Sequence, residues 1–419
     1  MFNYPIAISL SPNTEIDDVL QAIRTLLQPW MWKEGSQINK VERWFCEYFG
    51  VKSAVSFNSG RSALYALLKT FEIGEGDEVI IQAFTCVAVA DPILWAGAKP
   101  VFVDIDESLN IDYRLIERKI TGKTKAIIVQ HTFGVPANLN KITKIAQKHN
   151  ILLIEDCAHS LGAKYEGKKL GSIGDAAFFS FGRDKVISSV FGGTAIISSK
   201  FKAGAPRASS KLRNIQSKLN NPSYFWILQQ LLHPIAFFFI LPLYNLVIGK
   251  LILFLFINTK VLSKPVNKEE LRGEMPKVFP FKYPNALAIL LLKQLIKLEV
   301  YNDRRRKIAD FYYKNLIKNE NIVLPQKISG SIYLRFNVLI RNARNVIEKA
   351  KKDGVILGNW YHNIIDPNGV EFGKIGYCLG SCRKAEDYAC RSINLPTYPL
   401  LNIEKVRRVV GLINKYVRD

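Results

Sequence analysis

Between residues 51 and 199 the chain alternates short apolar, β-branched runs with stretches that place apolar residues at helical spacing. Several of the short runs are apolar almost throughout, as expected for strands buried on both faces of a mostly parallel sheet. The helical stretches between them include residues 61–71 and 139–150. This alternation predicts a doubly wound α/β domain with the strands SAVSF, DEVIIQAF, KPVFVDI, KAIIVQH, ILLIED, AAFFSF and GTAIIS.

The last third of the chain has a different pattern. Apolar residues at helical spacing over residues 286–316 predict one long connecting helix, and the runs that follow it (YLRFNVLI, NVIEKAKKDGV and KVRRVVGLINKYV) predict a smaller α+β domain. We therefore expect three parts: a large α/β domain over residues 1–199, a helical insertion over 200–280, and the connecting helix with the C-terminal domain over 281–419.

The insertion combines a basic balance with a long apolar run. Residues 200–280 hold twelve Lys or Arg and three Glu, whereas residues 219–249 contain no charged side chain and the run LILFLFI follows Lys250. Its length approaches that of a transmembrane helix, but Pro234, Pro242 and His233 interrupt it. Three short apolar helices with basic flanks are predicted instead. They would pack in a dimer or domain interface or lie in a membrane surface, with a true span as the third alternative.

Composition limits the partners. The chain has 58 Lys+Arg against 36 Asp+Glu, a net charge of +22, which favours phosphate-bearing ligands or anionic lipid. No zinc-finger or RNP-type pattern is present, so we expect no nucleic-acid partner. The six scattered cysteines indicate a reduced, intracellular protein and complete no zinc spacing, so we expect no metal site. The first twenty residues do not resemble a secretory signal.

Three segments of the α/β domain combine residues suited to chemistry. In ILLIEDCAHS a buried strand ends in Glu155 and Asp156, and His159 follows. A carboxylate there either bonds its own loop or faces a protonated heterocyclic nitrogen. In SFNSGRSALYALL a strand, a small-polar turn and a helix start follow one another. The backbone N–H groups of such a helix start, together with Arg61 and Ser62, predict a phosphate cradle.

The third segment, SFGRDKVISSVFGG, presents Lys185 just after a strand and before a glycine pair. A surface lysine would be solvated, whereas partial burial beside Arg183 would lower the pKa of Lys185 and make its amine nucleophilic. A phosphate cradle, a carboxylate for a pyridinium and a lysine for an imine are together what pyridoxal 5′-phosphate (PLP) requires.

These segments, in this order, resemble the DegT/DnrJ/EryC1/StrS family of PLP-dependent sugar aminotransferases. The similarity is carried by INKVERWFCEYFGVKSAVSFNSGRSALYALL, GDEVIIQAFTCVAVADPILWAGAKPVFVDID, TKAIIVQHTFGVPANLNKI, residues 151–197, LKQLIKLEVYNDRRRKIADFY and AEDYACRSINLPTYPLL; segment 200–280 takes no part. The resemblance implies the type I (aspartate aminotransferase) fold: a mostly parallel, doubly wound sheet with a smaller α+β C-terminal domain.

The resemblance also implies roles for individual residues. Lys185 would bind PLP as a Schiff base and then move protons, and Asp156 would pair with the pyridinium nitrogen. His159 would lie beside the ring. The remaining cofactor contacts implied are Ser180, Gly60, Arg61, Ser62 and Cys86. The chain departs from the family pattern at three places: Arg61 replaces a usual Thr, Cys86 replaces a frequent aromatic, and Pro280-Phe281-Lys282 replaces an Asn-x-Arg segment that reaches the neighbouring subunit.

The activity implied is amino transfer from an amino acid, L-glutamate in the family, to a keto sugar carried on a nucleotide, in amino-sugar or surface polysaccharide biosynthesis. We expect a cytoplasmic homodimer with ping-pong kinetics, whose small-molecule substrates bind in turn. Two alternatives stay open: another type I PLP reaction, and a membrane-associated protein that acts on a lipid-linked precursor and contacts the inner membrane face through residues 219–257.

Overall fold

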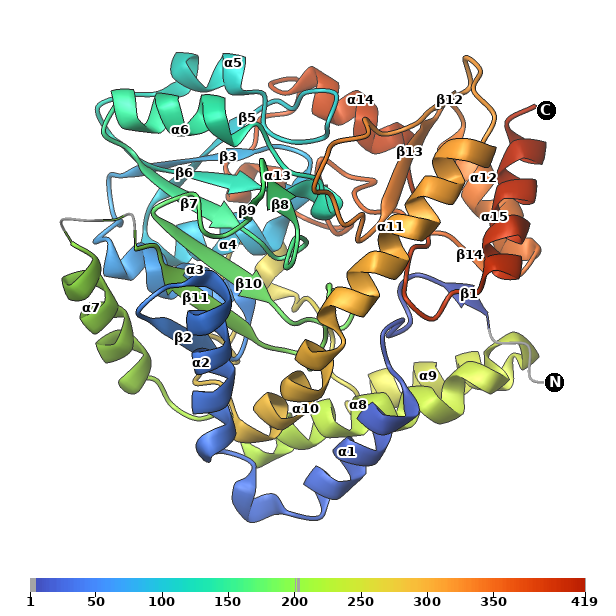
Figure 1. Ribbon diagram of the computed structural model, residues 1–419, viewed down its shortest axis with the longest axis horizontal. Helices are drawn as coiled ribbons and strands as arrows, with labels where there is room; N and C mark the ends of the chain where they lie inside the picture. Colours follow the sequence, from blue (N-terminus) through green and yellow to red (C-terminus); the bar gives the residue numbers. More distant parts are fainter. Residues whose placement is uncertain (1–4, 200, 202–203, 419) are drawn as a thin grey trace.

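A computed structural model describes residues 5–199, 201 and 204–418. Its centre is a seven-stranded sheet (Figure 1) in which β11 runs opposite to the other six strands. All seven strands predicted from the apolar runs are present, and the doubly wound, mostly parallel fold class is confirmed. In spatial order they are β2 (Ala54–Phe57), β11 (Gly193–Ile197), β10 (Ala176–Ser180), β7 (Leu152–Asp156), β6 (Thr124–Gln130), β3 (Glu78–Gln82) and β5 (Lys99–Val103).

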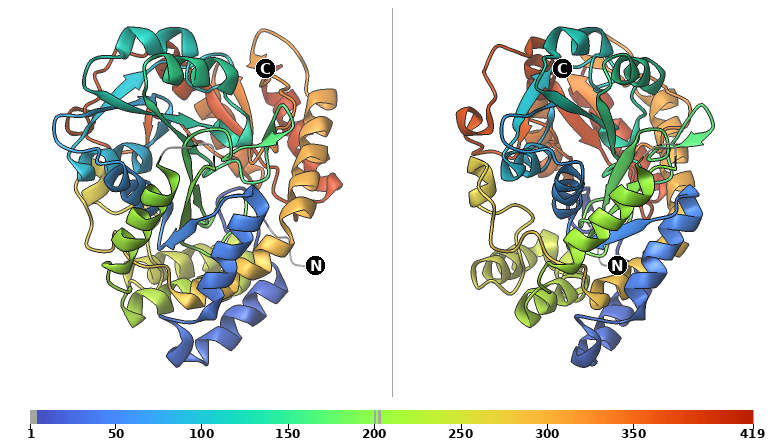
Figure 2. Two further views of the ribbon diagram at one scale, coloured as in Figure 1. Left: turned by 60° about the vertical axis from the view of Figure 1, so that its left-hand side comes forward. Right: turned by 90° about the vertical axis from the view of Figure 1, so that its left-hand side faces the viewer.

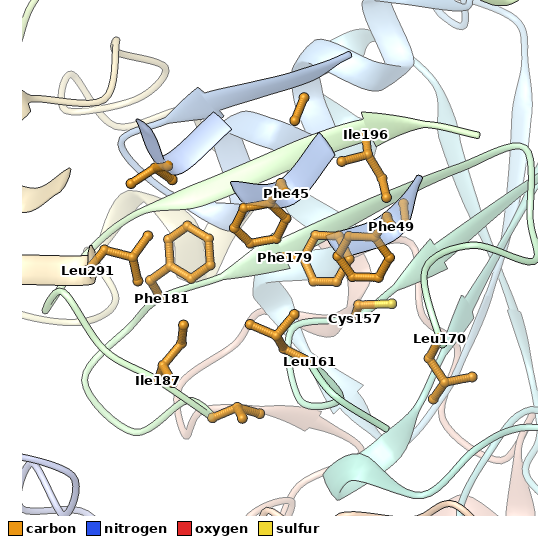
Figure 3. Close-up of a cluster of buried hydrophobic side chains, with 14 of the residues drawn as sticks. Phe45, Phe49, Cys157, Leu161, Leu170, Phe179, Phe181, Ile187, Ile196 and Leu291 are labelled. Carbon is orange, nitrogen blue, oxygen red and sulfur yellow. The ribbon is translucent and has the colours of Figure 1, made fainter. Parts of the chain in front are cut away.

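Helices cover both faces of this sheet because successive strand residues point to opposite sides. Ile80 of β3 packs in one buried cluster, while its neighbours Val79 and Ile81 pack in the other. In the first cluster (Figure 3) Phe49 and Phe179 have ring centroids 4.9 Å apart. That cluster takes side chains from α2 (Ser36–Phe49), α6 (Leu139–Lys148) and α10 (Asn285–Ile296), and the second from α3 (Gly60–Thr70), α4 (Val87–Ala96) and α7 (Ala205–Ser217).

The C-terminal part has its own apolar cluster and an antiparallel sheet of order β12-β13-β16. Near the N-terminus, β1 (Ile6–Ala7) pairs in parallel with β14 (Val355–Ile356), a contact that the sequence did not predict. The other elements of this part are α11 (Leu298–Asn315), β12 (Ile322–Val323), β13 (Phe336–Ile340), α12 (Ala343–Lys352), β15 (Ile365–Asp366), α13 (Phe372–Ile375), α14 (Arg383–Arg391), β16 (Ser392–Leu395) and α15 (Ile403–Tyr416).

The single connecting helix predicted over residues 286–316 is two helices, α10 and α11, which meet at Lys297. The Lys297 backbone (φ −87°, ψ −7°) stays in the right-handed region, but its N–H bonds to the Gln294 carbonyl, three residues back, instead of continuing the α-helical pattern. Its ammonium lies 2.5 Å from Asp17 Oδ1 and 2.7 Å from Glu15 Oε2, at the start of α1 (Ile16–Leu26). The tertiary contact with α1 thus coincides with the break, which local helical spacing could not reveal.

The insertion also differs from the expected three short helices. After α7, its apolar part consists of α8 (Tyr224–Leu243), a 3-10 turn η4 (Tyr244–Leu246) and α9 (Ile248–Asn258). α8 continues through Pro234 and Pro242. A proline inside a helix removes one backbone hydrogen bond. α8 stays continuous where it packs against α1 and α10. Its side chains Ile227 and Leu231 are fully buried in the first apolar cluster.

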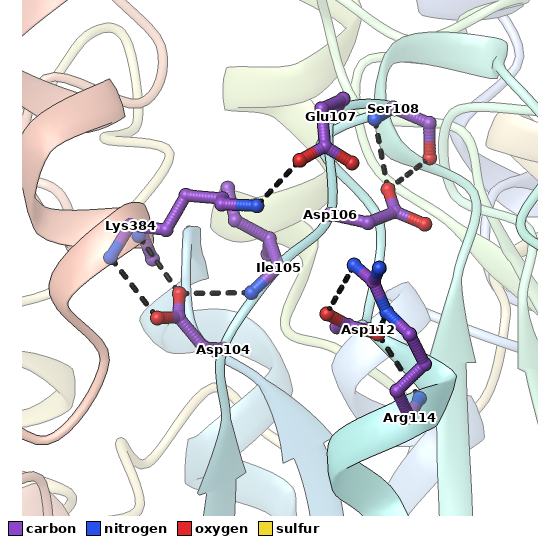
Figure 4. A network of polar contacts seen from close by, with 9 residues as sticks. Asp104, Ile105, Asp106, Glu107, Ser108, Asp112, Arg114 and Lys384 are labelled. Carbon is purple, nitrogen blue, oxygen red and sulfur yellow. Dashed lines mark hydrogen bonds and ion pairs between the residues drawn. The ribbon is translucent and has the colours of Figure 1, made fainter.

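A polar network joins the large domain to the C-terminal part beyond β5 (Figure 4). The Asp104 carboxylate accepts the backbone N–H groups of Lys384 and Ala385, at 3.0 and 2.8 Å, in the first turn of α14. An acidic side chain at a helix N-terminus accepts hydrogen bonds from the first-turn N–H groups, and its negative charge interacts favourably with the positive end of the helix dipole. Lys384 Nζ also lies 2.6 Å from Glu107 Oε1. These contacts hold the C-terminal part against the large domain.

Candidate active site

Three neighbouring segments meet at one edge of the large sheet. Asp156 ends β7 and pairs in register with Phe178 of β10, which ends two residues later at Ser180. Gly193 of β11 lies opposite Ser180 and approaches Gly60 so closely that a Cβ on Gly193 would stand 2.5 Å from the Gly60 nitrogen. The carboxyl ends of β7 and β10 and the start of α3 are therefore adjacent, as ligand sites in such sheets require.

Lys185 reaches this edge from the loop after β10. Its Nζ lies 2.9 Å from His159 Nε2, and Asn13 Nδ2 donates to its backbone carbonyl at 2.8 Å. Burial lowers the pKa of Lys185, against the opposing effect of the neighbouring Asp184 carboxylate. A lowered pKa increases the fraction of neutral amine, which is the nucleophilic form. The geometry supports the interpretation of Lys185 as a site residue rather than a solvated lysine.

His159 is buried and neutral. Burial lowers its pKa well below the ordinary histidine value, and the Lys185 and Arg335 cations lower it further. The Phe133 backbone N–H points at His159 Nδ1 at 3.4 Å, so we assign the proton of the neutral ring to Nε2. In that tautomer Nε2–H points at Lys185 Nζ and can donate to it when the Lys185 amine is unprotonated.

The carboxylate at the end of β7 is also buried. Among the residues that the structure describes, Asp156 uses only Oδ1 for hydrogen bonding, accepting the Ala158 N–H at 2.9 Å. Burial raises the pKa of Asp156, and the Ala158 N–H and the Lys185 cation oppose that rise. A protonated ring nitrogen beside the second oxygen would stabilise the carboxylate, so this residue fits the pyridinium of PLP.

The N-terminus of α3 has groups that suit the phosphate of PLP. The Ser59 side chain caps the helix by accepting the Ser62 N–H at 3.0 Å, whereas the N–H groups of Gly60 and Arg61 have no acceptor within the helix. Ser180 borders them, since a Cβ on Gly60 would lie 2.9 Å from Ser180 Cβ. These two N–H groups and the partly exposed Ser180 hydroxyl could hold a phosphate, as the N-termini of helices do in anion-binding proteins. The Ser62 hydroxyl is fully buried and donates to Asn58 Oδ1 at 2.7 Å, away from this opening.

The Arg61 side chain turns toward the insertion. Its guanidinium forms an ion pair with the fully buried Glu270, donates to the Pro265 carbonyl at 2.9 Å and lies 4.3 Å from the Phe279 ring centroid. These partners neutralise and position the guanidinium. In this arrangement Arg61 offers the cradle its backbone N–H rather than its charge.

Cys86 lies in β4 (Thr85–Cys86), which pairs with β15, and burial raises the pKa of its thiol to about 12. The thiol is thus protonated and acts as a small apolar group. Aromatic rings come from elsewhere: Phe133 stacks on His159 with centroids 5.8 Å apart, and Tyr361 stacks on Phe133 at 5.5 Å. Sequence reasoning missed both aromatics.

Sequence reasoning also missed Arg335 and Asp184, which form an ion pair next to Lys185 in which Arg335 is buried and Asp184 is partly exposed. Arg335 is 2% exposed, directly precedes β13 in the C-terminal part, and its guanidinium lies 3.6 Å from the Trp360 ring centroid. The only signal was a charged arginine inside the mainly apolar run YLRFNVLI. Folding brings it to a lysine 150 positions earlier in the chain.

The segment that replaces the family's Asn-x-Arg pairs with its own chain. The Phe281 carbonyl accepts the Asn58 N–H at 3.1 Å, and the Phe281 N–H donates to Asn58 Oδ1 at 3.0 Å. Lys282 bridges to Phe57 at the end of β2. The segment therefore buttresses the turn before α3.

Comparisons with known proteins show the family to which the chain is similar. The model of the DegT/DnrJ/EryC1/StrS aminotransferase family matches residues 13–206 and 261–414. The chain is 28% identical over 402 residues to the UDP-N-acetyl-3-dehydro-alpha-D-glucosamine 3-aminotransferase of Acidithiobacillus ferrooxidans, covering 95% of this chain and 94% of that protein. It is also 28% identical to the GDP-perosamine synthase of Escherichia coli O157:H7, with 93% of each chain covered.

Solved structures show the same fold. Helicobacter pylori PseC, an aminotransferase involved in pseudoaminic acid biosynthesis, matches with a TM-score of 0.74 and 22% identity, covering 100% of this chain and 99% of that one. A DegT DnrJ EryC1 StrS aminotransferase from Brucella abortus matches with a TM-score of 0.73 and 22% identity over 96% of each chain. The family model passes over residues 207–260, which hold most of α7 and all of α8 and α9. The segment outside the family similarity is therefore shorter than the expected 200–280, because the model also matches 200–206 and 261–280.

Proposed function

This chain belongs to the DegT/DnrJ/EryC1/StrS aminotransferase family, and we propose that it transfers an amino group from L-glutamate to a keto sugar carried on a nucleotide. The protein is a PLP-dependent aminotransferase that acts on small-molecule sugar substrates. One observation carries the assignment of its site: the Lys185 amine lies 2.9 Å from a neutral histidine, at the sheet edge that also holds Asp156 and the start of α3.

Each site residue has a task in this proposal. When bound, PLP supplies a carbonyl that condenses with amines and a ring that withdraws electrons from the reacting carbon. Lys185 is the residue for covalent attachment and for moving the donor's α-proton, first as base and then as acid. His159 orients the Lys185 amine through Nε2. Asp156 holds a cationic ring nitrogen in place, and the N–H groups of Gly60 and Arg61, with the Ser180 hydroxyl, bind the phosphate.

The nucleotide-linked acceptor is supported by charge and by the relatives. A net charge of +22 favours a ligand that carries phosphates. The relatives named above take UDP- and GDP-linked sugars by their names, and another, from Bacillus subtilis, is a spore coat polysaccharide biosynthesis protein. We therefore place the reaction in amino-sugar or surface polysaccharide biosynthesis. Donor and acceptor would use the site in turn. Double-reciprocal plots of the initial rate against donor concentration, at several acceptor concentrations, should therefore be parallel; intersecting lines would contradict the proposal.

Two features of the surroundings belong to the same proposal. We infer that the enzyme works as a cytoplasmic homodimer, as the resemblance implies, and that residues 219–257 make a peripheral membrane contact. α8 is the one helix of the described chain that is long and apolar enough to span a bilayer, but half of its apolar window is buried inside the protein. A contact along the membrane surface suits such a helix better than a span.

The decisive experiment is an absorbance spectrum of the purified protein with PLP. We expect a visible band that L-glutamate bleaches and that a nucleotide-linked keto sugar restores. The Lys185→Ala variant should lack the band, and the exposed-lysine control Lys168→Ala should keep it. Borohydride reduction followed by peptide mass spectrometry should locate the cofactor on Lys185. An unchanged band in Lys185→Ala would overturn the assignment of the site.

A further inference from the structure

Exposed apolar side chains gather in two segments of the molecule. Of the 22 large hydrophobic residues that the described structure exposes, 15 lie within residues 16–30 and 224–255. We call these 15 residues the apolar face: Ile16, Leu20, Ile23, Leu27, Trp30, Tyr224, Phe225, Phe238, Phe239, Leu246, Val247, Ile248, Leu251, Phe254 and Leu255. Monomeric soluble proteins rarely leave so many large apolar groups together without a partner.

The helices that carry the apolar face lie at one end of the molecule. α1 packs along α8, and the 3-10 turn η1 (Pro29–Met31) follows α1. In both Figure 1 and Figure 2 these elements and α9 occupy the lower end of the molecule, with α8 and α9 running across it in Figure 1. Ile16, Leu20, Ile23 and Leu27 recur at four- and three-residue spacing and form one stripe of α1, whereas Val19 and Ala22 of the same helix are buried.

α8 and α9 differ in how much of their apolar surface is buried. The first half of α8 belongs to the protein interior, since Trp226, Ile227 and Leu231 are buried in the first apolar cluster. In α9 the only buried residue is Gly249, and Phe254 is 64% exposed although the helix is apolar throughout except for Lys250 and Asn258. α8 thus anchors the insertion in the protein, and α9 presents an apolar surface with no counterpart in the family model.

The basic residues around the apolar face indicate what kind of partner binds to it. Residues 207–260 contain six Lys or Arg and no Asp or Glu. Lys250 and Lys260 are exposed on and just after α9, and Lys33 lies over the Tyr224 ring at 4.2 Å. Apolar helices with basic and aromatic borders are typical of proteins that lie in the interface of an anionic bilayer. A second copy docked face to face through α8 and α9 would bring these cations together, with no acidic residue in 207–260 to compensate them.

We propose that the apolar face binds the surface of an anionic lipid bilayer, with α1, η1 and α9 inserted into the headgroup boundary. This extends the peripheral contact proposed above beyond residues 219–257, because it includes the N-terminal helix and Trp30. It does not depend on the aminotransferase assignment. The catalytic residues lie in other elements, so the protein would bind lipid and PLP independently.

Vesicle co-sedimentation of the full chain loaded with PLP tests the proposal. We expect strong binding to phosphatidylcholine vesicles that contain phosphatidylglycerol, and weak binding to phosphatidylcholine alone or at raised ionic strength. Replacing Leu251, Phe254 and Leu255 together by Ser should lower the partition coefficient at least about tenfold, because three large apolar groups no longer enter the interface. The matched control replaces Val323, Leu379 and Leu400 by Ser. These residues are exposed outside the apolar face, so the control should bind vesicles like the wild type.

A second measurement tests the part played by η1. Trp30 is 73% exposed and is the only tryptophan among the large exposed residues of the described chain. Brominated lipids should quench its fluorescence, and Trp30→Phe should lose most of that quenching.

The proposal is overturned if the wild type does not bind anionic vesicles, or if the α9 variant binds them as well as the wild type does. Absence of vesicle binding together with a change of solution mass in the α9 variant would assign the face to a second copy. The PLP absorbance band and its bleaching by L-glutamate should be the same in the α9 variant and the wild type. Their loss in both proteins would count against the aminotransferase assignment and leave the lipid result intact.

Discussion

The ion pair between Arg61 and Glu270 offers the sharpest test of how the insertion is attached to the active site. Glu270 lies in η5 (Glu269–Arg272) and is fully buried, and the Arg61 side chain is 10% exposed. Besides Arg61, the Glu270 carboxylate accepts the Asn267 N–H at 2.7 Å and Asn267 Nδ2 at 3.0 Å. We propose Arg61→Met as the perturbation, since methionine preserves much of the apolar stem over Phe279 and removes the charge.

The expected magnitude follows from burial. Removing one partner of a buried pair leaves an uncompensated charge and typically costs about 3–5 kcal/mol, whereas replacing both partners costs far less. Arg61→Met leaves Glu270 with only the Asn267 groups and with the buried carboxyl of Asp91 nearby. We therefore expect a loss of about 3 kcal/mol in Arg61→Met and of about 1 kcal/mol in the double variant Arg61→Met/Glu270→Gln.

Urea unfolding followed by tryptophan fluorescence measures both losses, and equilibrium titration with PLP measures cofactor affinity. If the guanidinium acts on the insertion, the single variant loses stability and keeps its PLP affinity within about threefold of wild type once folded. The reasoning is refuted if Arg61→Met is as stable as the wild type, or if the double variant is no more stable than the single one. A large loss of PLP affinity without loss of stability would instead assign the Arg61 side chain to the phosphate, as the family resemblance implies.

Two further predictions concern buried carboxyls. Asp156→Asn should still bind PLP on Lys185 but lose at least about a hundredfold in transamination rate, because the amide cannot hold the ring nitrogen cationic; single-turnover kinetics with L-glutamate measures this, and a rate within tenfold of wild type would contradict the assigned role. Burial, and then the Glu270 carboxylate, raise the pKa of Asp91 to about 9. Between pH 3.8, the ordinary pKa of this carboxyl, and pH 9 the folded protein keeps a proton that the unfolded chain has released. Asp91 therefore lowers the free energy of unfolding by an amount that grows as the pH rises toward 9. Asp91→Asn should therefore gain stability over the wild type between pH 5 and pH 8, by an amount that grows with pH; a gap independent of pH would count against it.

The sequence alone determined most of the sheet and the start of the site. Strands buried on both faces are apolar throughout, so the seven central strands were readable from local composition. The positions of Lys185, Asp156 and the turn at Gly60 were also readable, because Asp156 ends such a strand and the other two lie in the segments that follow one. In a doubly wound sheet those positions lie at one edge.

Only the tertiary structure decided the contacts that join distant segments. The ion pair of Arg335 with Asp184, the turn of Arg61 toward Glu270, and the pairing of β1 with β14 each join residues far apart in the chain. Continuity of α8 through two prolines and the break at Lys297 likewise accompany packing against α1. Local patterns describe which residues prefer burial or a helix. They contain no information about which partner a buried charge will meet, because that partner is selected by the packing of the whole chain.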